Sequence, residues 1–362
     1  MNIAIVLNHM NRGGLASYVV AAANGLQERG HNVYVLSRGG ELQDKVRHFI
    51  LPIKGKNAFS LHNLSLSRRL VDFVKDNSID CIWAQTRISA VMGTVASKFS
   101  GARLITTAHG FYRLNLGRLL FPCWGQKVIA ISRAVCEDLK RTHGVSSDKI
   151  VVVYNGICGD KVALLKAKMQ QYRPVARQRL GIEDGSVVLG MLARISYAKG
   201  HKVALQAIAS SSQRHRIKFL FLGKGAEKEE KELNALIKEL NLRRNVLWIK
   251  EIEDTALFWA GVDAILVPSI EEGLGLTAIE AQLLGVPVIA SSAGGLKEVV
   301  EEGRTGRMFE TGDFKGLAGL LDEFVNKRYD FSLFAENAKR RAEDLFSCDR
   351  FISGIESVLK GG

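Results

Sequence analysis

Short runs of apolar, often β-branched residues alternate with longer stretches of helical periodicity along the 362-residue chain. Strands are predicted at 2–7, 33–37, 80–85, 103–108, 127–131 and 149–154, and again near 187–192, 218–222, 246–249, 264–267 and 287–290. Helices are predicted at 14–29, 61–77, 88–99 and 133–142, and then near 200–212, 226–240, 275–284, 313–327 and 333–360. Strands separated by helices are typical of β-α-β units, so the pattern predicts parallel sheets.

The chain is long for one hydrophobic core, because single cores rarely grow beyond about 250–300 residues. Five or six strands in each half predict two doubly wound α/β domains, with a boundary after the turn at 154–156. We predict an N-terminal domain over 1–165, a second domain over 166–345 and a C-terminal helix over 346–362 that packs back towards the N-terminal domain. Ligands of open parallel sheets bind beyond the carboxyl ends of the strands, so two facing sheets predict one interdomain cleft.

Charge is distributed unevenly along the chain. Residues 1–179 contain 26 Lys and Arg against 10 Asp and Glu, whereas residues 180–362 contain 24 against 27. This asymmetry indicates that the basic first half meets something anionic. Nucleic acid, a membrane surface and a phosphorylated or acidic substrate are all compatible with it.

The five cysteines are scattered and include no C-x-x-C pair, so neither a disulfide framework nor a zinc site is expected. A reducing cytosol is then the simplest compartment. The apolar run after Met1 is too short for a signal peptide, and no run approaches the ~18–20 apolar residues needed to cross a bilayer.

Three loops that follow predicted strands are candidates for binding phosphate. Gly13-Gly14 opens the first helix, where backbone N–H groups can meet an anion, although a plain tight turn is the alternative. Arg194 and Lys199 lie at the two ends of one loop. The planar guanidinium of the arginine and the compact ammonium of the lysine can converge on one diphosphate. The alternative is a basic loop that is merely solvated. Gly223-Lys224-Gly225 could admit a nucleotide, but a lone G-x-G is a weak signal.

The strongest pattern follows the strand at 264–267. Glu272 lies in a Gly-rich turn, and Glu280 lies on the apolar stripe of the next helix, which is formed by Leu276, Ile279, Leu283 and Leu284. A carboxylate is costly to bury without a partner, so we expect Glu280 to bind a ribose diol, or alternatively a neighbouring Lys or Arg. The N–H groups of Gly275, Leu276 and Thr277 at the helix start are suited to phosphate.

The segment at 109–127 is a candidate for contact with a ligand or a membrane. His109 ends a strand and points into the predicted cleft, although a single His is usually structural. Apolar and aromatic residues follow, interleaved with cations and no acid, which suits the headgroup region of an anionic leaflet. The candidate membrane and acceptor residues are Arg113, Arg118, Phe121, Trp124 and Lys127. The alternative is a core helix with its arginines outside.

In this order, the features resemble the retaining glycosyltransferases of family four (glycosyltransferase group 1), which have the GT-B fold and include many bacterial surface-polysaccharide enzymes. The resemblance covers essentially the whole chain. The matching pieces are Gly13-Gly14, His109, the strand end at 130–132, the turn at 154–156, Arg194…Lys199-Gly200, Gly223-x-Gly225, Glu272-x7-Glu280 and Gly294-Gly295-x-x-Glu298. Three departures are Ala193 in place of the usual Gly, Leu274 in place of Phe, and Cys158 in place of Asp.

The resemblance implies a role for each matching position. Four residues are implied to be catalytic: Glu272 binds hydroxyls of the donor sugar, His109 lies near the sugar on the acceptor side, and Arg194 and Lys199 bind the diphosphate and steady the leaving group. The implied donor-binding residues are Gly13, Gly14, Gly223, Gly225, Gly275, Leu276, Thr277 and Glu280, with Gly14 touching the diphosphate, Glu280 the ribose, and the Leu276 and Thr277 amides the distal phosphate.

The chemistry expected is hexosyl transfer from a nucleotide-sugar, with a UDP-sugar favoured, to a lipid-linked, lipopolysaccharide or polysaccharide acceptor at the inner face of the cytoplasmic membrane. No D-x-D pair occurs, so a metal bridging the diphosphate is not expected, nor is any other cofactor. No nucleophile lies beside an obvious base, as double displacement would require.

Two alternatives stay open at this point. A nucleotide-sugar 2-epimerase on the same fold would use the donor site without an acceptor, and would leave the 110–127 segment unexplained. A basic nucleic-acid-binding protein would use the net charge of +13. Against it, the chain has no helix-turn-helix, zinc-finger or RNA-binding signature, and the excess charge avoids the half with the nucleotide motifs. We therefore expect no nucleic-acid partner.

Overall fold

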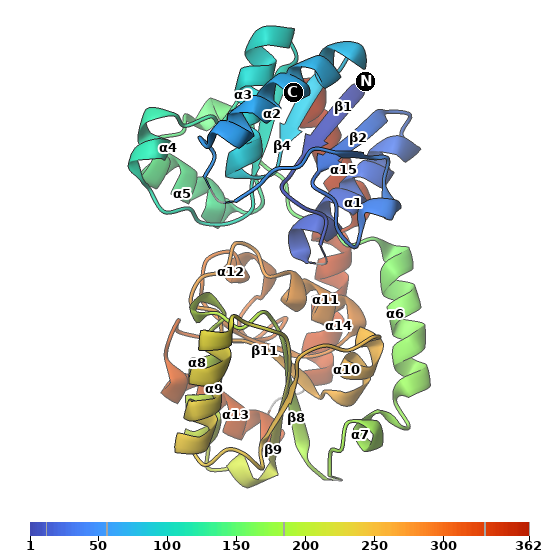
Figure 1. Ribbon diagram of the computed structural model, residues 1–362. Helices are drawn as coiled ribbons and strands as arrows, with labels where there is room; N and C mark the ends of the chain where they lie inside the picture. The colour runs from blue at the N-terminus through green and yellow to red at the C-terminus, as the bar shows by residue number, and fades with distance from the viewer. Residues whose placement is uncertain (12, 56, 184, 329–330, 362) are drawn as a thin grey trace. The chain divides into compact units, whose positions relative to one another are not determined.

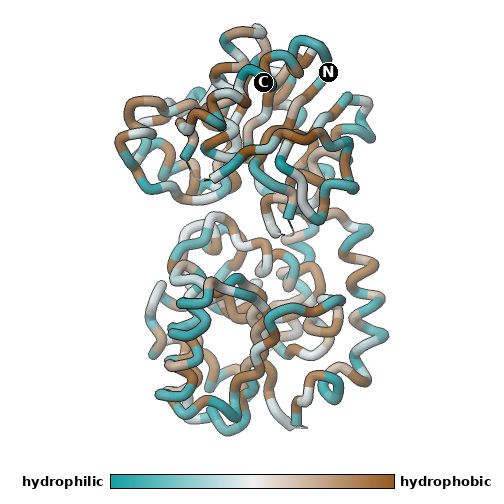
Figure 2. Tube along the Cα trace, in the orientation of Figure 1, coloured by the Kyte–Doolittle hydropathy of each residue, from teal (hydrophilic) through white to brown (hydrophobic). Residues whose placement is uncertain are grey.

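The computed structural model describes residues 1–11, 13–55, 57–183, 185–328 and 331–361 (Figure 1). The chain forms two compact units: unit 1 combines Met1–Cys158 with Phe346–Gly362, and unit 2 is Gly159–Leu345. The division lies a few residues before the expected 165/166, because the helix α6 (Gly159–Tyr172) packs against α10 (Thr255–Gly261) of unit 2. Hydrophobic and hydrophilic residues alternate along α6 in Figure 2, as a surface helix with one packed face requires.

Unit 1 contains a seven-stranded parallel sheet in the order β3-β2-β1-β4-β5-β6-β7. The strands are β1 (Asn2–Val6), β2 (Asn32–Ser37), β3 (His48–Ile50), β4 (Cys81–Ala84), β5 (Arg103–Ala108), β6 (Lys127–Ala130) and β7 (Ile150–Val152). The edge strand β3 is absent from the sequence prediction, because its three residues include only one β-branched residue, whereas the equally short β7 consists of Ile and Val throughout.

Helices cover both faces of this sheet. They are α1 (Gly14–Glu28), α2 (Leu61–Asp76), α3 (Arg87–Ser100), α4 (Leu116–Leu120), α5 (Arg133–His143) and α15 (Cys348–Lys360), with the 3₁₀ turns η1 (Gln43–Lys45) and η2 (Ser147–Lys149). Side chains alternate across β1, so Ile3 and Ile5 join the core formed with α1 and α15, whereas Ala4 and Val6 join the core formed with α2 and α3.

The C-terminal segment belongs to unit 1. One helix was expected over 333–360, but α14 (Phe331–Leu345) ends in unit 2, and α15 begins after Ser347, whose hydroxyl accepts the N–H of Arg350. α15 packs on α1, and Arg29 of α1 pairs with Glu356 at 2.8 Å. The helix is therefore broken where the chain passes from one unit to the other.

A disulfide joins Cys158 to Cys348, which are 190 residues apart in sequence with their Cα atoms 4.7 Å apart. The sequence analysis expected no disulfide framework and did not predict this bond. Spacing along the chain could not indicate the pair, because the two positions meet only after α15 has packed on unit 1. The remaining described cysteines, Cys81, Cys123 and Cys136, are free thiols.

Unit 2 contains a six-stranded parallel sheet in the order β10-β9-β8-β11-β12-β13. The strands are β8 (Val187–Leu192), β9 (Ile217–Leu222), β10 (Val246–Ile249), β11 (Ala264–Val267), β12 (Val288–Ser291) and β13 (Arg307–Phe309). The other helices of this unit are α7 (Ala176–Arg179), α8 (His201–Ser210), α9 (Glu227–Glu239), α11 (Leu276–Leu284), α12 (Leu296–Val299) and α13 (Phe314–Val325), with 3₁₀ turns η3 (Tyr197–Lys199) and η4 (Arg214–Arg216). The short edge strand β13 was not predicted, for the same reason as β3.

Both units are therefore doubly wound parallel-sheet domains, which confirms the predicted fold class. The β8 side chains illustrate it: Leu189 and Met191 join the core with α8, α9 and α13, while Gly190 faces Phe258 of α10. Within the described part of the chain, no helix combines the length and the apolar character needed to cross a bilayer.

Candidate functional site

The carboxyl edge of the unit 2 sheet brings together most of the predicted donor residues. The strand order reverses between β8 and its neighbours β9 and β11, and such a switch point is where open α/β sheets bind ligands. Arg194 and Lys199 follow β8, Gly223 follows β9, and Glu272 follows β11. The predicted residues of these separate loops therefore meet at one edge.

Close backbone contacts hold these loops against one another. Gly200 has φ +71°, and a Cβ added there would lie 1.8 Å from the carbonyl oxygen of Pro268. A Cβ on Gly223 would lie 2.0 Å from the carbonyl oxygen of Ala193. Only glycine allows these approaches, so the loops after β8, β9 and β11 form one rigid floor.

Glu272 and Lys199 form an ion pair across this floor, with Nζ 2.7 Å from Oε2. The Ser269 hydroxyl donates a second hydrogen bond to the same oxygen at 3.0 Å. The Glu272 side chain is only 13% exposed, so both contacts are partly shielded from water. The carboxylate is held in place, and the Lys199 charge is balanced without a ligand.

Arg194 is exposed, and its guanidinium makes no hydrogen bond or ion pair with another described residue. It lies two residues beyond β8, on the loop that ends at Lys199. A guanidinium offers five N–H donors in a planar fork, so Arg194 can grip an oxyanion with two parallel hydrogen bonds.

The start of α11 adds backbone donors. Gly275 precedes the helix with φ 104°, and no side chain caps it, so the first N–H groups lack a side-chain acceptor. The Thr277 hydroxyl donates to the carbonyl oxygen of Leu192 at 3.1 Å, which fixes the helix start beside the end of β8. The geometry suits an anion at the amides of Leu276 and Thr277.

Glu280 lies one turn further along α11. Its Oε1 is 3.8 Å from Nζ of Lys161 on α6. Burial raises the pKa of Glu280, and Lys161 opposes that shift. At 3.8 Å the two groups attract each other but do not form a hydrogen bond, so the carboxyl keeps acceptor capacity for a ligand hydroxyl.

Gly225 closes the loop after β9. Its N–H donates to Oε1 of Glu230 at 3.1 Å, and an added Cβ would lie 2.7 Å from Cβ of Ile195. Like Gly223, it places the loop against the β8 loop.

In unit 1, Gly13 and Gly14 begin α1 beyond the carboxyl end of β1. Gly13 has φ 154°, its helix has no side-chain cap, and an added Cβ would meet nothing within 4 Å. The helix start is thus exposed and open. Arg12, the residue before these glycines, lies outside the described residues.

His109 follows β5 of unit 1. Its Nε2 lies 2.9 Å from Oε1 of Gln85, the residue after β4, and its ring stands edge-on to Tyr18 at 4.8 Å. Burial lowers the pKa of His109 to about 3. The imidazole is therefore neutral at physiological pH, donates Nε2–H to Gln85, and keeps Nδ1 as an acceptor.

The segment after His109 contradicts the core-helix alternative. α4 is only five residues long and contains no buried residue. Leu116, Leu119 and Leu120 are 70%, 65% and 61% exposed, and Phe121 is 56% exposed. The apolar side of this segment therefore faces solvent.

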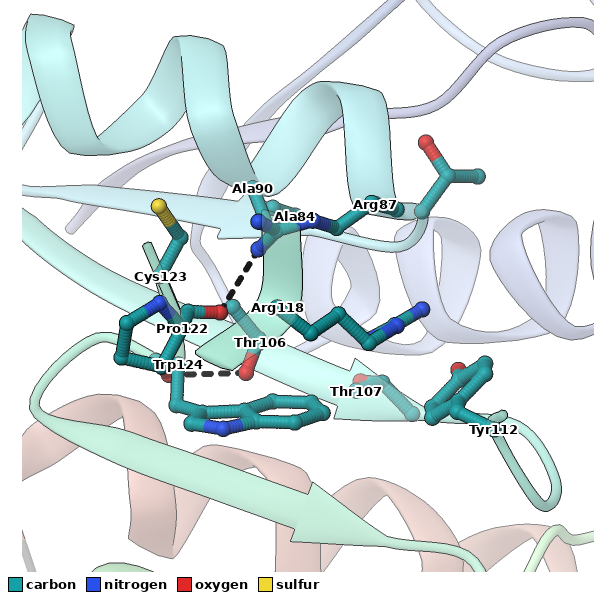
Figure 3. Close-up of a pocket in the computed structure, with 11 residues that line it drawn as sticks. Ala84, Arg87, Ala90, Thr106, Thr107, Tyr112, Arg118, Pro122, Cys123 and Trp124 are labelled. Atoms are coloured by element: carbon teal, nitrogen blue, oxygen red, sulfur yellow. Dashed lines mark hydrogen bonds between the residues drawn. The ribbon is translucent and has the colours of Figure 1, made fainter. Parts of the chain in front are cut away.

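The five predicted membrane and acceptor residues occupy different places. Arg113 and Phe121 are exposed. Arg118 and Trp124 instead line a pocket beneath the segment (Figure 3). Lys127 begins β6, where its Nζ donates to the carbonyl of Asp148. Trp124 and Lys127 are half-buried and do not belong to the exposed surface.

Some site residues escaped the sequence analysis. Gln85 orients His109, Ser269 holds Glu272, and Lys161 lies beside Glu280. Gln85 and Ser269 could have been found, because both follow strands at the same edges as their partners. Lys161 had no such signal, since α6 reaches α11 only through tertiary packing.

Two doubly wound parallel-sheet units in one chain define the GT-B architecture. The sequence matches the family described as "Glycosyltransferase Family 4" over residues 12–160 and that described as "Glycosyl transferases group 1" over residues 173–342. Together the two matches span most of the chain. The chain belongs to this family of glycosyltransferases, which confirms the resemblance.

Relatives match along nearly their whole length. The "Capsular polysaccharide biosynthesis glycosyltransferase CapM" of Staphylococcus aureus is 26% identical over 356 residues, covering 92% of this chain and 90% of that protein. The "N-acetyl-alpha-D-glucosaminyl L-malate synthase" of Bacillus anthracis is 24% identical over 351 residues, with the same coverage. The crystal structure of Anabaena Alr3699/HepE in complex with UDP and glucose superposes with a TM-score of 0.86 at 22% identity, covering 99% of each chain.

Proposed function

We propose that this glycosyltransferase moves a hexose from a UDP-sugar, with retention of configuration and without a metal ion, to a lipid-linked or surface-polysaccharide acceptor at the cytoplasmic face of the membrane. One observation supports the proposal that the donor is a nucleotide-sugar. The Lys199–Glu272 pair, the unpartnered Arg194 and the uncapped start of α11 gather at the switch point of unit 2. A UDP and glucose complex of a protein with the same fold supports the choice of donor.

The ion pair suggests how donor binding prepares the site. A diphosphate carries more negative charge than a carboxylate, so it competes for Lys199 and gains Arg194 as a second cation. Glu272 then keeps its bond to Ser269 and can accept hydrogen bonds from sugar hydroxyls. The cations stabilise the charge that develops on the leaving phosphate, because they are already in place when the bond breaks.

Retention follows from attack on the face that the leaving group vacates. The bond between the anomeric carbon and the β-phosphate oxygen breaks, the acceptor oxygen bonds to that carbon on the same face, and its proton passes to the departing phosphate. His109 is neutral, so we assign it hydrogen bonding through Nδ1 to substrate and no role as a proton-donating imidazolium.

Unit 1 supports the acceptor and membrane part. It contains 22 Lys and Arg against 11 Asp and Glu, whereas unit 2 contains 28 against 26. Exposed leucines on a basic unit favour attachment to an anionic leaflet, because stable attachment needs an apolar and an electrostatic contribution together. The capsular-polysaccharide relative supports a surface-polysaccharide acceptor.

The donor assignment is tested by thermal unfolding with a panel of UDP-, GDP- and ADP-sugars. We expect one UDP-sugar to raise the Tm of the wild type, because a ligand that binds the folded state stabilises it. Lys199→Ala should lose this shift. Stabilisation by a GDP- or ADP-sugar alone would overturn the choice of base, and conversion of the donor to an isomer without acceptor would indicate an epimerase. The anomeric configuration of the product, read by NMR, tests retention.

A further inference from the structure

A pocket lies beneath α4 in unit 1, separate from the donor residues of unit 2 (Figure 3). Its cavity volume is about 20 Å³, room for about one water molecule, and it opens to solvent, so a larger group must sit at its mouth. Arg87 begins α3, Thr107 lies in β5, and Arg118 and Trp124 come from the segment after His109. Its described lining residues include no Asp or Glu.

Two guanidinium groups face this pocket, and they differ in their partners. Arg87 donates to the carbonyl oxygens of Pro122 at 2.7 Å and Gly117 at 2.9 Å, and also to that of Phe121. These bonds close the C-terminal end of α4, so Arg87 fixes the segment in place.

Arg118 has no such partner. Its Cζ lies 4.3 Å from the centroid of the Tyr112 ring and 5.6 Å from that of Trp124. No carboxylate or carbonyl of the described residues accepts a hydrogen bond from its guanidinium. Figure 3 shows the side chain of Arg118 extended along the pocket towards Tyr112.

This placement is unfavourable for the cation alone. Burial lowers the pKa of Arg118, and the neighbouring Arg87 lowers it further, against the effect of Tyr112. A half-buried guanidinium beside a second cation gains most from an anion, because an oxyanion supplies both the missing charge and the missing acceptors.

The pocket is continuous with the exposed apolar residues through α4 itself. Arg118 points inwards, while Leu116, Leu119 and Leu120 of the same short helix face solvent. Phe59, which precedes α2, packs beside this face with its ring 5.5 Å from that of Phe121. An anion bound at Arg118 therefore lies directly beneath a surface suited to hydrocarbon.

Tyr112 links the pocket to the catalytic candidate of unit 1. Its hydroxyl oxygen accepts the backbone N–H of His109 at 3.1 Å, and its ring carries the Arg118 guanidinium. His143 also donates to the Tyr112 carbonyl at 3.1 Å, which fixes the loop. An anion at Arg118 is thus held by the same loop that places His109.

We propose that the open mouth of this pocket binds the phosphate or diphosphate of a lipid-linked acceptor, with Arg118 as its ligand and the leucines of α4 beside its hydrocarbon chain. An acceptor of this class joins an anion to an apolar tail, as the pocket joins a cation to an apolar surface. The inference rests on the proposed function and specifies its acceptor.

The experiment uses the full chain and three soluble or vesicular probes: farnesyl diphosphate, inorganic pyrophosphate, and phosphatidylglycerol vesicles. Binding is followed by tryptophan fluorescence, because Trp124 lines the pocket, and Trp124→Phe identifies its share of the signal. The test variant is Arg118→Gln. Arg141→Gln is the matched control, since Arg141 is exposed on α5 of the same unit and does not line the pocket.

We expect farnesyl diphosphate to bind the wild type and Arg141→Gln equally, and Arg118→Gln at least tenfold more weakly. Pyrophosphate should bind the wild type more weakly than farnesyl diphosphate, because it lacks the tail. Phosphatidylglycerol vesicles should bind Arg118→Gln as they bind the wild type. Arg118→Lys should recover part of the affinity, because it restores the charge without the fork, and this recovery would separate a lost ligand from a misfolded loop.

Three results would overturn the proposal. Equal affinity of the wild type and Arg118→Gln for farnesyl diphosphate would show that Arg118 does not bind the diphosphate. Equal affinity for pyrophosphate and farnesyl diphosphate would make it a free-phosphate site, and loss of vesicle binding alone would make it a phospholipid site. Thermal shifts with UDP-sugars separate this failure from failure of the proposed function, because the Lys199–Glu272 pair and Arg194, which carry the donor assignment, lie in unit 2.

Discussion

The two units place contrasting surfaces at the carboxyl ends of their strands. In unit 2 the loops touch backbone to backbone, as Gly200 does against Pro268, and Lys199 is paired with Glu272. In unit 1 the loop after β5 runs from His109 to Gln126 around a five-residue helix whose leucines face solvent, and Arg118 is unpaired. One surface is rigid and has its lysine paired, with Arg194 left free for an anion; the other is apolar, basic and open.

The contrast fits the two ligands of the proposed function. A nucleotide-sugar is small and dense in polar groups, so a rigid floor with fixed donors can hold its diphosphate at little entropic cost. A glycolipid acceptor is large and amphiphilic, so it needs apolar area and a separate cation. Under the proposed function, the excess charge lies in the unit that meets the acceptor, since unit 1 has 22 Lys and Arg against 11 Asp and Glu.

The sharpest test of the unit 2 surface is Glu272→Ala. We expect transfer to fall by about a thousandfold, because fixed polar contacts to the reacting group typically supply that much. UDP affinity should hold or rise in this variant, since Lys199 loses its competing carboxylate. Lys199→Ala should lower both the rate of transfer and the affinity for UDP. Initial rates and UDP titration measure the two effects.

Glu271→Ala is the matched control for this prediction. Glu271 is the exposed neighbour of Glu272, and its backbone N–H, not its side chain, is bound to the Ala198 carbonyl. Normal transfer in Glu272→Ala, or an equal loss in Glu271→Ala, would remove Glu272 from the site.

The rigidity of unit 2 is tested by Gly200→Ala. The new Cβ would lie 1.8 Å from the Pro268 oxygen, so the loops must separate. We expect the free energy of unfolding to fall by about 3 kcal/mol and UDP affinity to fall with it. Gly181→Ala has a similar φ of +66° but meets nothing within 4 Å, so it should cost only about 1 kcal/mol. Urea unfolding compares them; equal losses would mean that backbone strain alone, not the contact, decides.

The open surface of unit 1 is tested by the double variant Leu116→Glu/Leu119→Glu. Both leucines are exposed, so the fold should tolerate the change, while recovery with phosphatidylglycerol vesicles in flotation should drop roughly tenfold. Leu164→Glu is the control, because Leu164 is 61% exposed on α6 of unit 2. If Leu164→Glu lowers recovery as much, the membrane surface is not where we place it.

The smallest expected effect is on the pH dependence of stability. It compares two histidines whose pKa is lowered by burial, His201 in unit 2 and His109 in unit 1. Burial lowers the pKa of His201 to about 4, with Lys199 adding to the shift. The unfolded chain takes up a proton below about pH 6.5 while folded His201 stays neutral, so stability is full above that pH and falls as the pH drops towards 4. Between pH 7.5 and 5.5 the loss should be about 1 kcal/mol.

His201→Leu should remove this loss without a cost at pH 7.5, because both ring nitrogens of His201 lack a hydrogen-bond partner among the described residues. His109→Leu, by contrast, should lower the free energy of unfolding even at pH 7.5, because it leaves the Gln85 oxygen without its hydrogen-bond donor. Tm measured against pH compares the two. A pH profile unchanged by His201→Leu would contradict the assigned shift.

Much of the fold was predictable because its signals are local. The alternation of apolar runs and helical stretches indicated β1, β8 and the other central strands, and caps such as Ser60 and Asp313 lie at the predicted helix starts. The edge strands β3 and β13 were not predicted, because neither forms a β-branched run and their pairing is set by the neighbouring strand.

The grouping of the candidate donor residues was also within reach of the sequence. Each follows a strand, and parallel strands bring their carboxyl ends to one edge, so Arg194, Lys199 and Glu272 had to lie near one another once the sheet was assumed. Their pairing was not predictable. The 2.7 Å contact between Lys199 and Glu272 depends on how closely Gly200 lets the two loops approach.

The sequence by itself determined the two α/β domains, the uneven charge and the residues suited to a diphosphate, because these depend on residue type and short spacing. The tertiary structure alone decided the Cys158–Cys348 bond, the break between α14 and α15, and the unpartnered Arg118. These features join segments up to 190 residues apart, and which groups meet, or fail to meet, is settled only when the helices and strands pack.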